Sequence, residues 1–238
     1  NAQENLEVAS IYSVANAQHT FGQRPFRAPH HTASAIALVG GGSQPKPGEI
    51  TLAHLGVLFL DELPEFDRKV LEVLRQPLES KEIVISRAAR QMTFPANFQF
   101  IAAMNPCPCG YAFNQDSRCQ CSAENIQRYQ NRISGPLLDR IDLHIDVPPL
   151  QTKELQDQSP TESSTIVRQR VMKAYDKQML RQQCLNQALS PNLLEQYAQL
   201  DENSAKIIEM AQQRLNLSAR AYHRVLRVAR TIADLAES

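Results

Sequence analysis

Two adjacent carboxylates follow a short apolar run, and they are the strongest chemical signal in the sequence. Gly56 opens the run at residues 57–60, and Asp61 and Glu62 close it. A short run without alternation is typical of a strand buried on both faces of a parallel sheet, and phosphates bind at the carboxyl edge of such sheets. There Asp61 would hold Mg²⁺ through its water shell, and Glu62 would polarise the water that attacks a phosphate. The alternative is a structural strand that ends in a solvated acidic turn.

A second apolar run, at residues 98–104, ends in the neutral polar residue Asn105. If this strand lies beside the first, Asn105 can hydrogen-bond a γ-phosphate or the attacking water. The alternative is an asparagine that caps the turn before Pro106. The spacing from the Asp-Glu pair favours the phosphate-sensing role.

Arg140 follows a Gly-Pro turn and precedes a third predicted strand, at residues 141–147. An arginine in this position can reach across a subunit interface and neutralise the charge of a transition state. The alternative is a surface pair of Arg140 with Asp139, which would contribute little to stability.

A basic stripe is predicted near the carboxyl end of the chain. Ser218 is a good helix N-cap, and Arg220, Arg224 and Arg227 follow at helical spacing on one face. Like charges at this spacing repel one another, so a bound anion such as a nucleotide or DNA phosphate would stabilise them. A solvated basic face with acidic partners is the alternative.

Four of the five cysteines lie within fifteen residues, at Cys107, Cys109, Cys119 and Cys121. In a cytosolic chain such a cluster favours Zn²⁺ over disulfides. The C-x-C spacing is tighter than that of common zinc ribbons, so a loop of free or oxidised thiols is the alternative. His30 and His31 are adjacent, and neighbouring side chains on a strand diverge, so joint metal binding is not expected.

The composition is that of an ordinary globular protein. The 238 residues carry 25 basic and 25 acidic side chains, so the formal net charge is zero, yet residues 214–230 contain five arginines and no acid. No apolar run approaches the length of a membrane span and no signal peptide is visible, which predicts a cytoplasmic protein without a membrane partner. No lysine precedes Ser or Thr, so the phosphate loop G-x-x-x-x-G-K-[ST] is absent.

These patterns predict an α/β core followed by a helical domain. Residues 1–150 form the α/β core, with a hairpin at 82–94 and a cysteine loop at 107–121. Residues 151–163 are a polar linker. Residues 164–238 contain no glycine and have helical periodicity throughout, which predicts a small all-helical lid domain.

Taken together, these residues resemble the magnesium-chelatase-like branch of the AAA+ ATPases, in its competence-protein ComM/YifB subfamily. The resemblance covers nearly the whole chain. Its most specific segments are residues 26–34, 56–63, 104–110 and 133–142. It implies a partial P-loop NTPase (AAA+) fold with a parallel sheet and a helical lid.

The resemblance also implies roles for individual residues. Asp61 and Glu62 correspond to Walker B, Asn105 to sensor 1 and Arg220 to sensor 2. Arg140 is the arginine-finger candidate, and Arg132 is the second one. The hairpin at 82–94, with Arg87 and Arg90 at its tip, corresponds to the pre-sensor-1 hairpin that points into the ring pore, where these two arginines would bind DNA.

The family implies homo-hexameric rings that hydrolyse ATP with Mg²⁺, and ComM-type members are helicases that promote DNA branch migration in natural transformation. The family's phosphate loop lies upstream of Walker B, so this chain corresponds to the carboxyl-terminal part of a protein about twice as long, and alone it is expected to bind ATP poorly. Three functions remain open: a motor on DNA, a chelatase-like motor on a protein partner, and a non-catalytic module stabilised by zinc.

Overall fold

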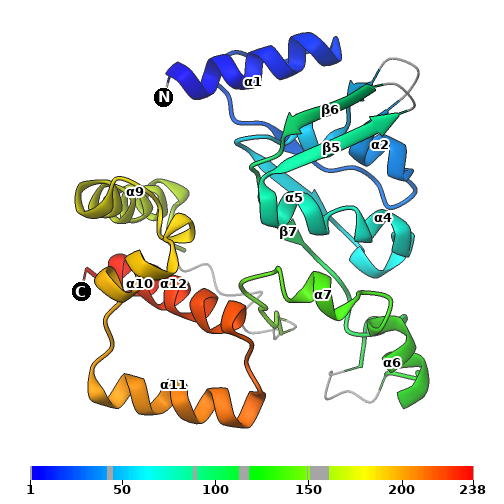
Figure 1. Cartoon of the computed structure of the whole chain (residues 1–238). Coiled ribbons are helices and arrows are strands. Elements are labelled where there is room, and N and C mark those ends of the chain that lie inside the picture. The colour runs from blue at the N-terminus through cyan, green and yellow to red at the C-terminus, as the bar shows by residue number, and fades with distance from the viewer. Residues whose placement is uncertain are drawn as a thin grey trace. The chain divides into compact units, whose positions relative to one another are not determined.

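The computed structural model describes residues 2–41, 45–87, 90–112, 118–148, 150 and 161–237; the side chains of residues 86–90 lie outside this description. The chain divides into two compact units, Asn1–Ile141 and Asp142–Ser238. The first contains the strands and several short helices, and the second is helical (Figure 1). None of the described helices is long and apolar enough to cross a membrane.

The first unit is built around a parallel sheet of three strands in the order β1-β4-β7. These strands are β1 (Phe26–Arg27), β4 (Val57–Leu60) and β7 (Gln99–Ala102). The β4–β7 ladder pairs Val57 with Gln99 and Leu60 with Ala102. The two apolar runs predicted as strands are therefore neighbours, and their carboxyl ends lie at one edge of the sheet.

Gly56 permits the close approach of β1 to β4. A Cβ atom at this position would lie 2.0 Å from the carbonyl oxygen of Pro25, and the next amide, of Val57, donates a hydrogen bond to that oxygen at 2.8 Å. Any side chain at residue 56 would push the two strands apart. Glycine is thus required for the start of the strand that leads to Asp61.

The core of the first unit lies on one face of this sheet. Leu58 and Leu60 are fully buried, whereas Val57 and Phe59 on the opposite face of β4 are only partly buried. The expectation of a strand buried on both faces is therefore wrong for the described residues. The elements around the core include α2 (Ala35–Val39), α3 (Glu49–Leu52), the 3₁₀ turn η1 (Leu63–Glu65), α4 (Arg68–Glu72) and α5 (Arg75–Ser80).

Two antiparallel ribbons and an amino-terminal helix complete this part of the unit. The hairpin expected at 82–94 is present as β5 (Glu82–Arg87) and β6 (Arg90–Pro95), and Ile83, Ile85 and Phe94 join the core. Helix α1 (Ala2–Ala15) packs Val8, Ile11 and Tyr12 around Leu52. The second ribbon pairs β2 (Gly40–Gly41) with β3 (Lys46–Pro47).

After β7 the chain forms α6 (Ala123–Gln130) and α7 (Gly135–Leu138). The third strand predicted at 141–147 is not formed. Leu143, Ile145 and Val147 are 61%, 78% and 86% exposed, and no hydrogen bond between described residues joins the backbone of 142–148. Apolar alternation alone does not make a strand, because a strand needs a hydrogen-bonded neighbour.

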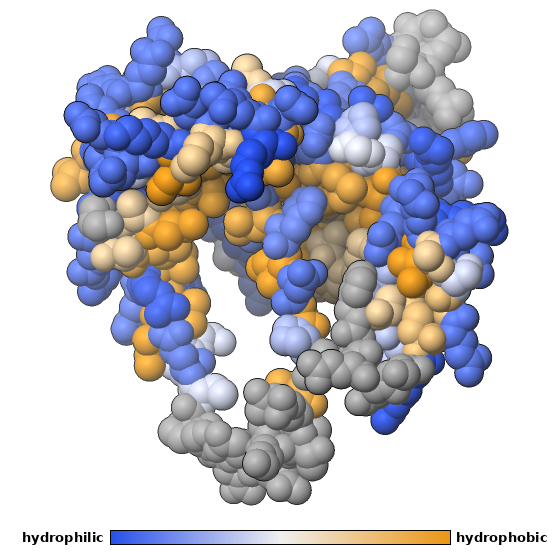
Figure 2. Space-filling view, turned by 90° about the horizontal axis from the view of Figure 1, so that it is seen from below, coloured by the Kyte–Doolittle hydropathy of each residue, from blue (hydrophilic) through white to orange (hydrophobic). Residues whose placement is uncertain are grey.

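Hydrophobic side chains reach the surface in several places on the face shown in Figure 2.

The second unit contains α9 (Ser164–Gln182), the 3₁₀ turn η2 (Asn186–Ala188), α10 (Pro191–Tyr197), α11 (Glu202–Leu215) and α12 (Ala219–Leu235). Serine or aspartate caps the amino end of each of the four α-helices, as the sequence favours. A small apolar cluster around Leu189, Leu194 and Leu226 holds α10 against α12. The predicted linker falls mainly on residues 151–160, which lie outside the described part of the chain.

Candidate functional site

The sheet brings Asp61, Glu62 and Asn105 to the same edge. Asp61 and Glu62 follow β4 directly, Asn105 comes three residues after β7, and all three are exposed. The backbone N–H of Leu63 donates to the carbonyl of Ala103 at 3.0 Å, which joins the two strand ends beyond the ladder. Two carboxylates and an amide are thus presented to solvent from neighbouring strand ends.

The turn at Glu62 has an unusual backbone. Glu62 has φ 51° and ψ 45°, in the left-handed region that non-glycine residues seldom adopt. Its backbone N–H donates to Asp61 Oδ1 at 2.8 Å. Strained positions of this kind cluster at functional sites, since the surrounding structure must hold them in place.

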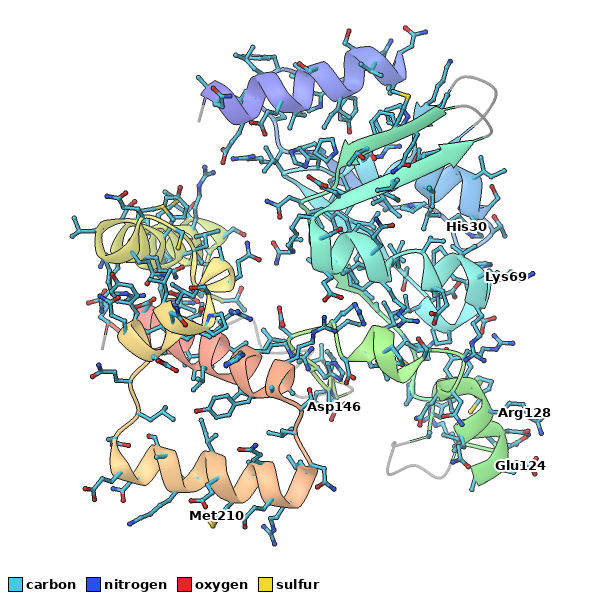
Figure 3. All side chains as sticks on the ribbon, in the orientation of Figure 1. His30, Lys69, Glu124, Arg128, Asp146 and Met210 are labelled. Atoms are coloured by element: carbon cyan, nitrogen blue, oxygen red, sulfur yellow. The ribbon has the colours of Figure 1, made fainter. Side chains whose placement is uncertain are left out.

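His31 lies next to the carboxylate of Glu62. Its Nδ1 is 3.0 Å from Glu62 Oε2, and its ring stands edge-on to Phe66. His30 lies in the loop between β1 and α2 (Figure 3). The centroid of its ring is 4.1 Å from that of His31. For this histidine pair the sequence favours a packing or surface role and leaves a loop role near a nucleotide or substrate as the alternative. The signal that identifies His31 is its place after the strand that pairs with β4.

The two finger candidates both bond within the first unit. Arg132 donates to the carbonyl of Pro64 at 3.0 Å and to Glu65 Oε2 at 2.9 Å, just after the acidic pair. Arg140 donates to the carbonyl of Pro136 and to Glu79 Oε2, each at 2.6 Å, and its side chain is only 14% exposed. Arg140 therefore pairs with Glu79, rather than with Asp139 as the intrachain alternative supposed.

The predicted basic stripe lies on α12, but two of its members bond inside the second unit. Arg227 donates through Nε and Nη2 to the carbonyl of Leu189, and Arg224 Nε lies 3.7 Å from Asp142 Oδ1. Arg220 is exposed in the first turn of the helix. Arg227 is therefore held without an anion, whereas the buried Nη1 of Arg224 has no hydrogen-bond partner among the described residues.

The structure pairs Arg87 with Arg90 in the register of the β5–β6 hairpin. Residues 88–89 and the side chains of both arginines lie outside the described part of the chain. Their proposed contact with DNA therefore stays a prediction.

The four clustered cysteines converge. Their Sγ atoms all lie within 4.8 Å of one another, and the Sγ of Cys107 is 3.3 Å from that of Cys109 and 3.8 Å from that of Cys119. Four thiolates placed tetrahedrally around zinc, with Zn–S bonds of about 2.3 Å, have Sγ atoms about 3.8 Å apart. The donor set and its spacing thus fit a tetrahedral thiolate site, with Cys107 fully buried.

The thiols of the cluster affect one another's ionisation. A hydrogen bond from the backbone at Tyr111, helped by neighbouring thiols, lowers the pKa of Cys109 to about 6. A backbone hydrogen bond at Cys121 opposes the change at Cys119, but desolvation and the nearby thiols raise its pKa to about 12. One thiolate is thus favoured at neutral pH, and four close thiolates would need a cation to neutralise their charge.

A groove of about 690 Å³ opens beside the acidic edge. Residues 64–68 form one wall, and α6 with the turn after it forms the other, including Glu124, Arg128 and Arg132. Glu124 and Arg128 project from α6 in Figure 3 and form an ion pair at 2.8 Å. The walls carry both signs of charge, which does not single out one class of ligand.

Comparison with known proteins places these features in context. The family model described as "Magnesium chelatase, subunit ChlI" matches residues 1–155, and the one described as "Magnesium chelatase, subunit ChlI C-terminal" matches residues 161–238.

Similar proteins occur in several bacteria. The chain is 52% identical over 236 residues to the Competence protein ComM of Haemophilus influenzae, covering 98% of this chain and 46% of that protein. It is 49% identical over 241 residues to the uncharacterized protein YifB of Escherichia coli, covering 99% and 47% respectively. It is 40% identical over 245 residues to the uncharacterized protein Rv2897c of Mycobacterium tuberculosis, covering 99% and 48%. The chain thus spans about half the length of these relatives.

Proposed function

The chain belongs to the magnesium chelatase family, and from that premise we propose that it carries the Walker B, sensor and lid residues of an AAA+ ring motor that hydrolyses ATP. The observation that carries this proposal is the edge of the sheet where Asp61 and Glu62 follow β4 and Asn105 follows the adjacent β7. Carboxylate and amide groups at the carboxyl ends of parallel strands suit Mg²⁺ and phosphate chemistry.

The chemistry of each side chain suggests a different role in ATP hydrolysis. Asp61 would hold Mg²⁺ through water, Asn105 would hydrogen-bond the γ-phosphate or the attacking water, and Glu62 would polarise that water. Bound ATP–Mg²⁺ would supply the phosphoryl group and the charge that activates it. The phosphate-binding cradle is not among these 238 residues, since no lysine precedes Ser or Thr. Turnover is therefore expected of the longer protein.

His31 supports the assignment of Glu62 as the residue that orients water. Its Nδ1 lies 3.0 Å from Glu62 Oε2, so it restrains a side chain whose backbone is already fixed in the left-handed region. A carboxylate that acts on water must be positioned as well as ionised. A solvated acidic turn without function would not need such a contact.

The test is Glu62→Gln in the full-length protein. The amide keeps the shape of the side chain but cannot polarise water, so kcat for ATP hydrolysis falls about 100-fold or more while ATP binding is retained. Glu195→Gln, the same change at an exposed glutamate of α10, is the matched control, and it should leave turnover within a few-fold. Wild-type turnover in the Glu62→Gln protein would contradict the role assigned to Glu62.

We propose DNA as the substrate of the motor. It is supported by the similarity to a competence protein and by the two arginines, Arg87 and Arg90, at the base of the β5–β6 turn. A helicase that promotes branch migration would contact phosphates at such a hairpin in the pore of the ring. A chelatase-like motor on a protein partner shares every ATPase residue and remains the second candidate, because the matching family models are named for a chelatase subunit.

The Arg87→Ala/Arg90→Ala double variant separates these two substrates. A lower DNA affinity together with a weaker salt dependence of binding supports DNA as the substrate. With fewer phosphate contacts, DNA binding releases fewer counterions, so the affinity depends less on salt. Arg118→Ala/Arg128→Ala is a control that removes equal charge outside the hairpin. Unchanged DNA binding in the hairpin variant favours the protein partner.

The ring assembly is proposed to be a homo-hexamer in which Arg140 acts as arginine finger, Arg132 is the second candidate and Arg220 serves as sensor 2. In this structure Arg140 bonds Glu79 and Pro136 of its own unit. It would therefore have to exchange these partners on ring assembly. Only if Arg132 served as the finger instead would it have to leave Glu65 and Pro64.

The cysteine cluster is proposed to bind structural Zn²⁺ through Cys107, Cys109, Cys119 and Cys121. Sulfur ligands and tetrahedral spacing select zinc over magnesium or calcium. The same site would serve a non-catalytic, zinc-stabilised module, which is the outcome if Glu62→Gln changes nothing. Elemental analysis that finds near-stoichiometric zinc supports the site.

A further inference from the structure

The two halves of the cysteine cluster come from two segments, one that follows β7 and one that precedes α6. Cys107 and Cys109 follow β7 and lie two and four residues after Asn105. Cys119 and Cys121 precede α6 directly, because Ser122 is the N-cap of that helix and accepts a hydrogen bond from the amide of Asn125 at 3.2 Å. An ion held by all four thiolates would join the sensor strand to the start of α6.

A second contact ties the same two segments together at the other end of the helix. Gln130, the last residue of α6, donates from Nε2 to the carbonyl of Pro106 at 3.0 Å. Pro106 stands between Asn105 and Cys107. The segment after the sensor strand is therefore fixed by one hydrogen bond and by a cluster that is built for a metal.

The helix also reaches the turn that follows the acidic pair. Two residues after Gln130, Arg132 donates to the carbonyl of Pro64 and to Glu65. Pro64 lies two residues after Glu62, and Leu63 bonds the carbonyl of Ala103 on the sensor strand. These contacts form a closed path from Asn105 through the cysteines and α6 to Glu62, and back through Leu63.

We infer that metal bound by the four cysteines is a clamp that positions Asn105 and α6 against the Walker B turn, and thereby controls ATP hydrolysis rather than ATP binding. This inference rests on the proposed ATPase function. The cysteines do not touch the reacting atoms; they act through Asn105 and through Arg132. Residues 64–68 and α6, which the clamp would hold together, also line the groove described above.

Without the metal, only weak thiol hydrogen bonds connect these side chains, with Sγ–Sγ distances of 3.3, 3.8 and 3.5 Å. The segment at residues 106–112 is then held mainly by the Gln130–Pro106 hydrogen bond. We expect Asn105 to lose its fixed position while the sheet, whose core contains none of these cysteines, stays folded.

The experiment uses the full-length protein and Zn²⁺ itself as the probe. Zinc is measured by elemental analysis in the wild type, in Cys109→Ser/Cys121→Ser and in Cys184→Ser, which removes the one cysteine outside the cluster. Nucleotide affinity, kcat, thermal unfolding and amide hydrogen exchange at residues 103–112 and 130–133 are then compared. A zinc-selective chelator followed by added Zn²⁺ provides the reversible version of the same test in excess Mg²⁺.

The expected result is zinc near one per chain in the wild type and in Cys184→Ser, and its loss in the double variant. Loss of zinc should lower kcat about 10-fold or more, as expected when a preorganised donor is displaced, with ATP affinity within about threefold. Exchange at 103–112 and 130–133 should rise, and Zn²⁺ should restore the chelated protein.

Three results would overturn the inference. They are a wild type without zinc, a zinc-free protein that keeps its kcat and its exchange protection, and unfolding of the first unit as a whole on loss of zinc. If the zinc-loaded protein shows no ATPase activity at all, the proposed function fails. In that case amide hydrogen exchange at residues 103–112 and 130–133, measured with and without zinc, still tests whether the metal holds these segments in place.

Discussion

His54 shows how a single buried residue links stability to pH. Its side chain is 7% exposed, and its Nδ1 accepts a hydrogen bond from the amide of Asn97 at 3.1 Å. The proton therefore sits on Nε2, which lies 3.5 Å from Glu7 Oε2. Burial lowers the pKa of His54 below its usual value of 6.5, although Glu7 opposes this change.

The lowered pKa predicts that the protein loses stability in mild acid. In the unfolded chain His54 binds a proton near its usual pKa, whereas in the folded state protonation of the buried ring is disfavoured. The free energy of unfolding therefore falls as the pH drops through about 6.5. Thermal unfolding of the first unit between pH 8 and pH 5 measures this slope.

His54→Gln should flatten that slope while lowering stability at every pH, because the amide cannot reproduce the buried imidazole. His144→Gln is the control, since His144 is exposed, and it should leave the slope unchanged. An equal slope in the wild type and His54→Gln would contradict the assignment.

At the scale of elements, the helical unit contains a buried polar network in addition to its small apolar cluster. Asp234 on α12 is buried and accepts hydrogen bonds from Arg181 on α9, from Arg230 and from Asn186 in η2. Burial opposes ionisation, but these donors lower the pKa of Asp234 to about 2. The network fixes α9 and η2 against α12.

Asp234→Ala should therefore destabilise the helical unit strongly. It leaves Arg181 without its carboxylate partner in a site where that side chain is only 22% exposed, and breaking a buried pair on one side costs about 3–5 kcal/mol. Denaturant unfolding followed by circular dichroism measures the loss. Lys173→Ala, which removes an exposed pair with Glu237, should change stability by less than about 0.5 kcal/mol. Similar effects of the two substitutions would contradict this role of Asp234.

At the scale of the whole molecule, the segment at residues 142–148 has a strand pattern without a strand. Its apolar side chains alternate, yet they are exposed and the described sheet ends at β7. The relatives are about twice as long as this chain. We therefore expect that residues outside this chain supply the missing neighbour in the longer protein.

Amide hydrogen exchange tests this expectation. In the 238-residue chain the amides of Leu143, Ile145 and Val147 should exchange without protection, whereas those of Phe59 and Leu60, in the middle strand, should be protected. In the full-length protein residues 143–147 should become protected as well. Protection of residues 143–147 in the short chain, or none in the long one, would rule out the missing neighbour.

Much of the first unit follows from the sequence, and the reason is local. The run at 57–60 is short, apolar and opened by a glycine, so it forms a strand in any α/β context, and the hairpin at 82–94 has two apolar arms around a turn. The segment at 141–147 has an equally good pattern, but a strand also requires a partner, which sequence periodicity does not report.

The sequence by itself determined the chemical types: an acidic pair after a buried strand, an asparagine after the next, and four thiols in a short span. Only the tertiary structure decided which groups meet. It placed His31 beside Glu62, turned Arg140 onto Glu79 and drew Arg224 and Arg227 into the helical unit. Residue types and strand signals are properties of short segments, whereas these contacts join residues far apart in the chain and depend on how the segments pack.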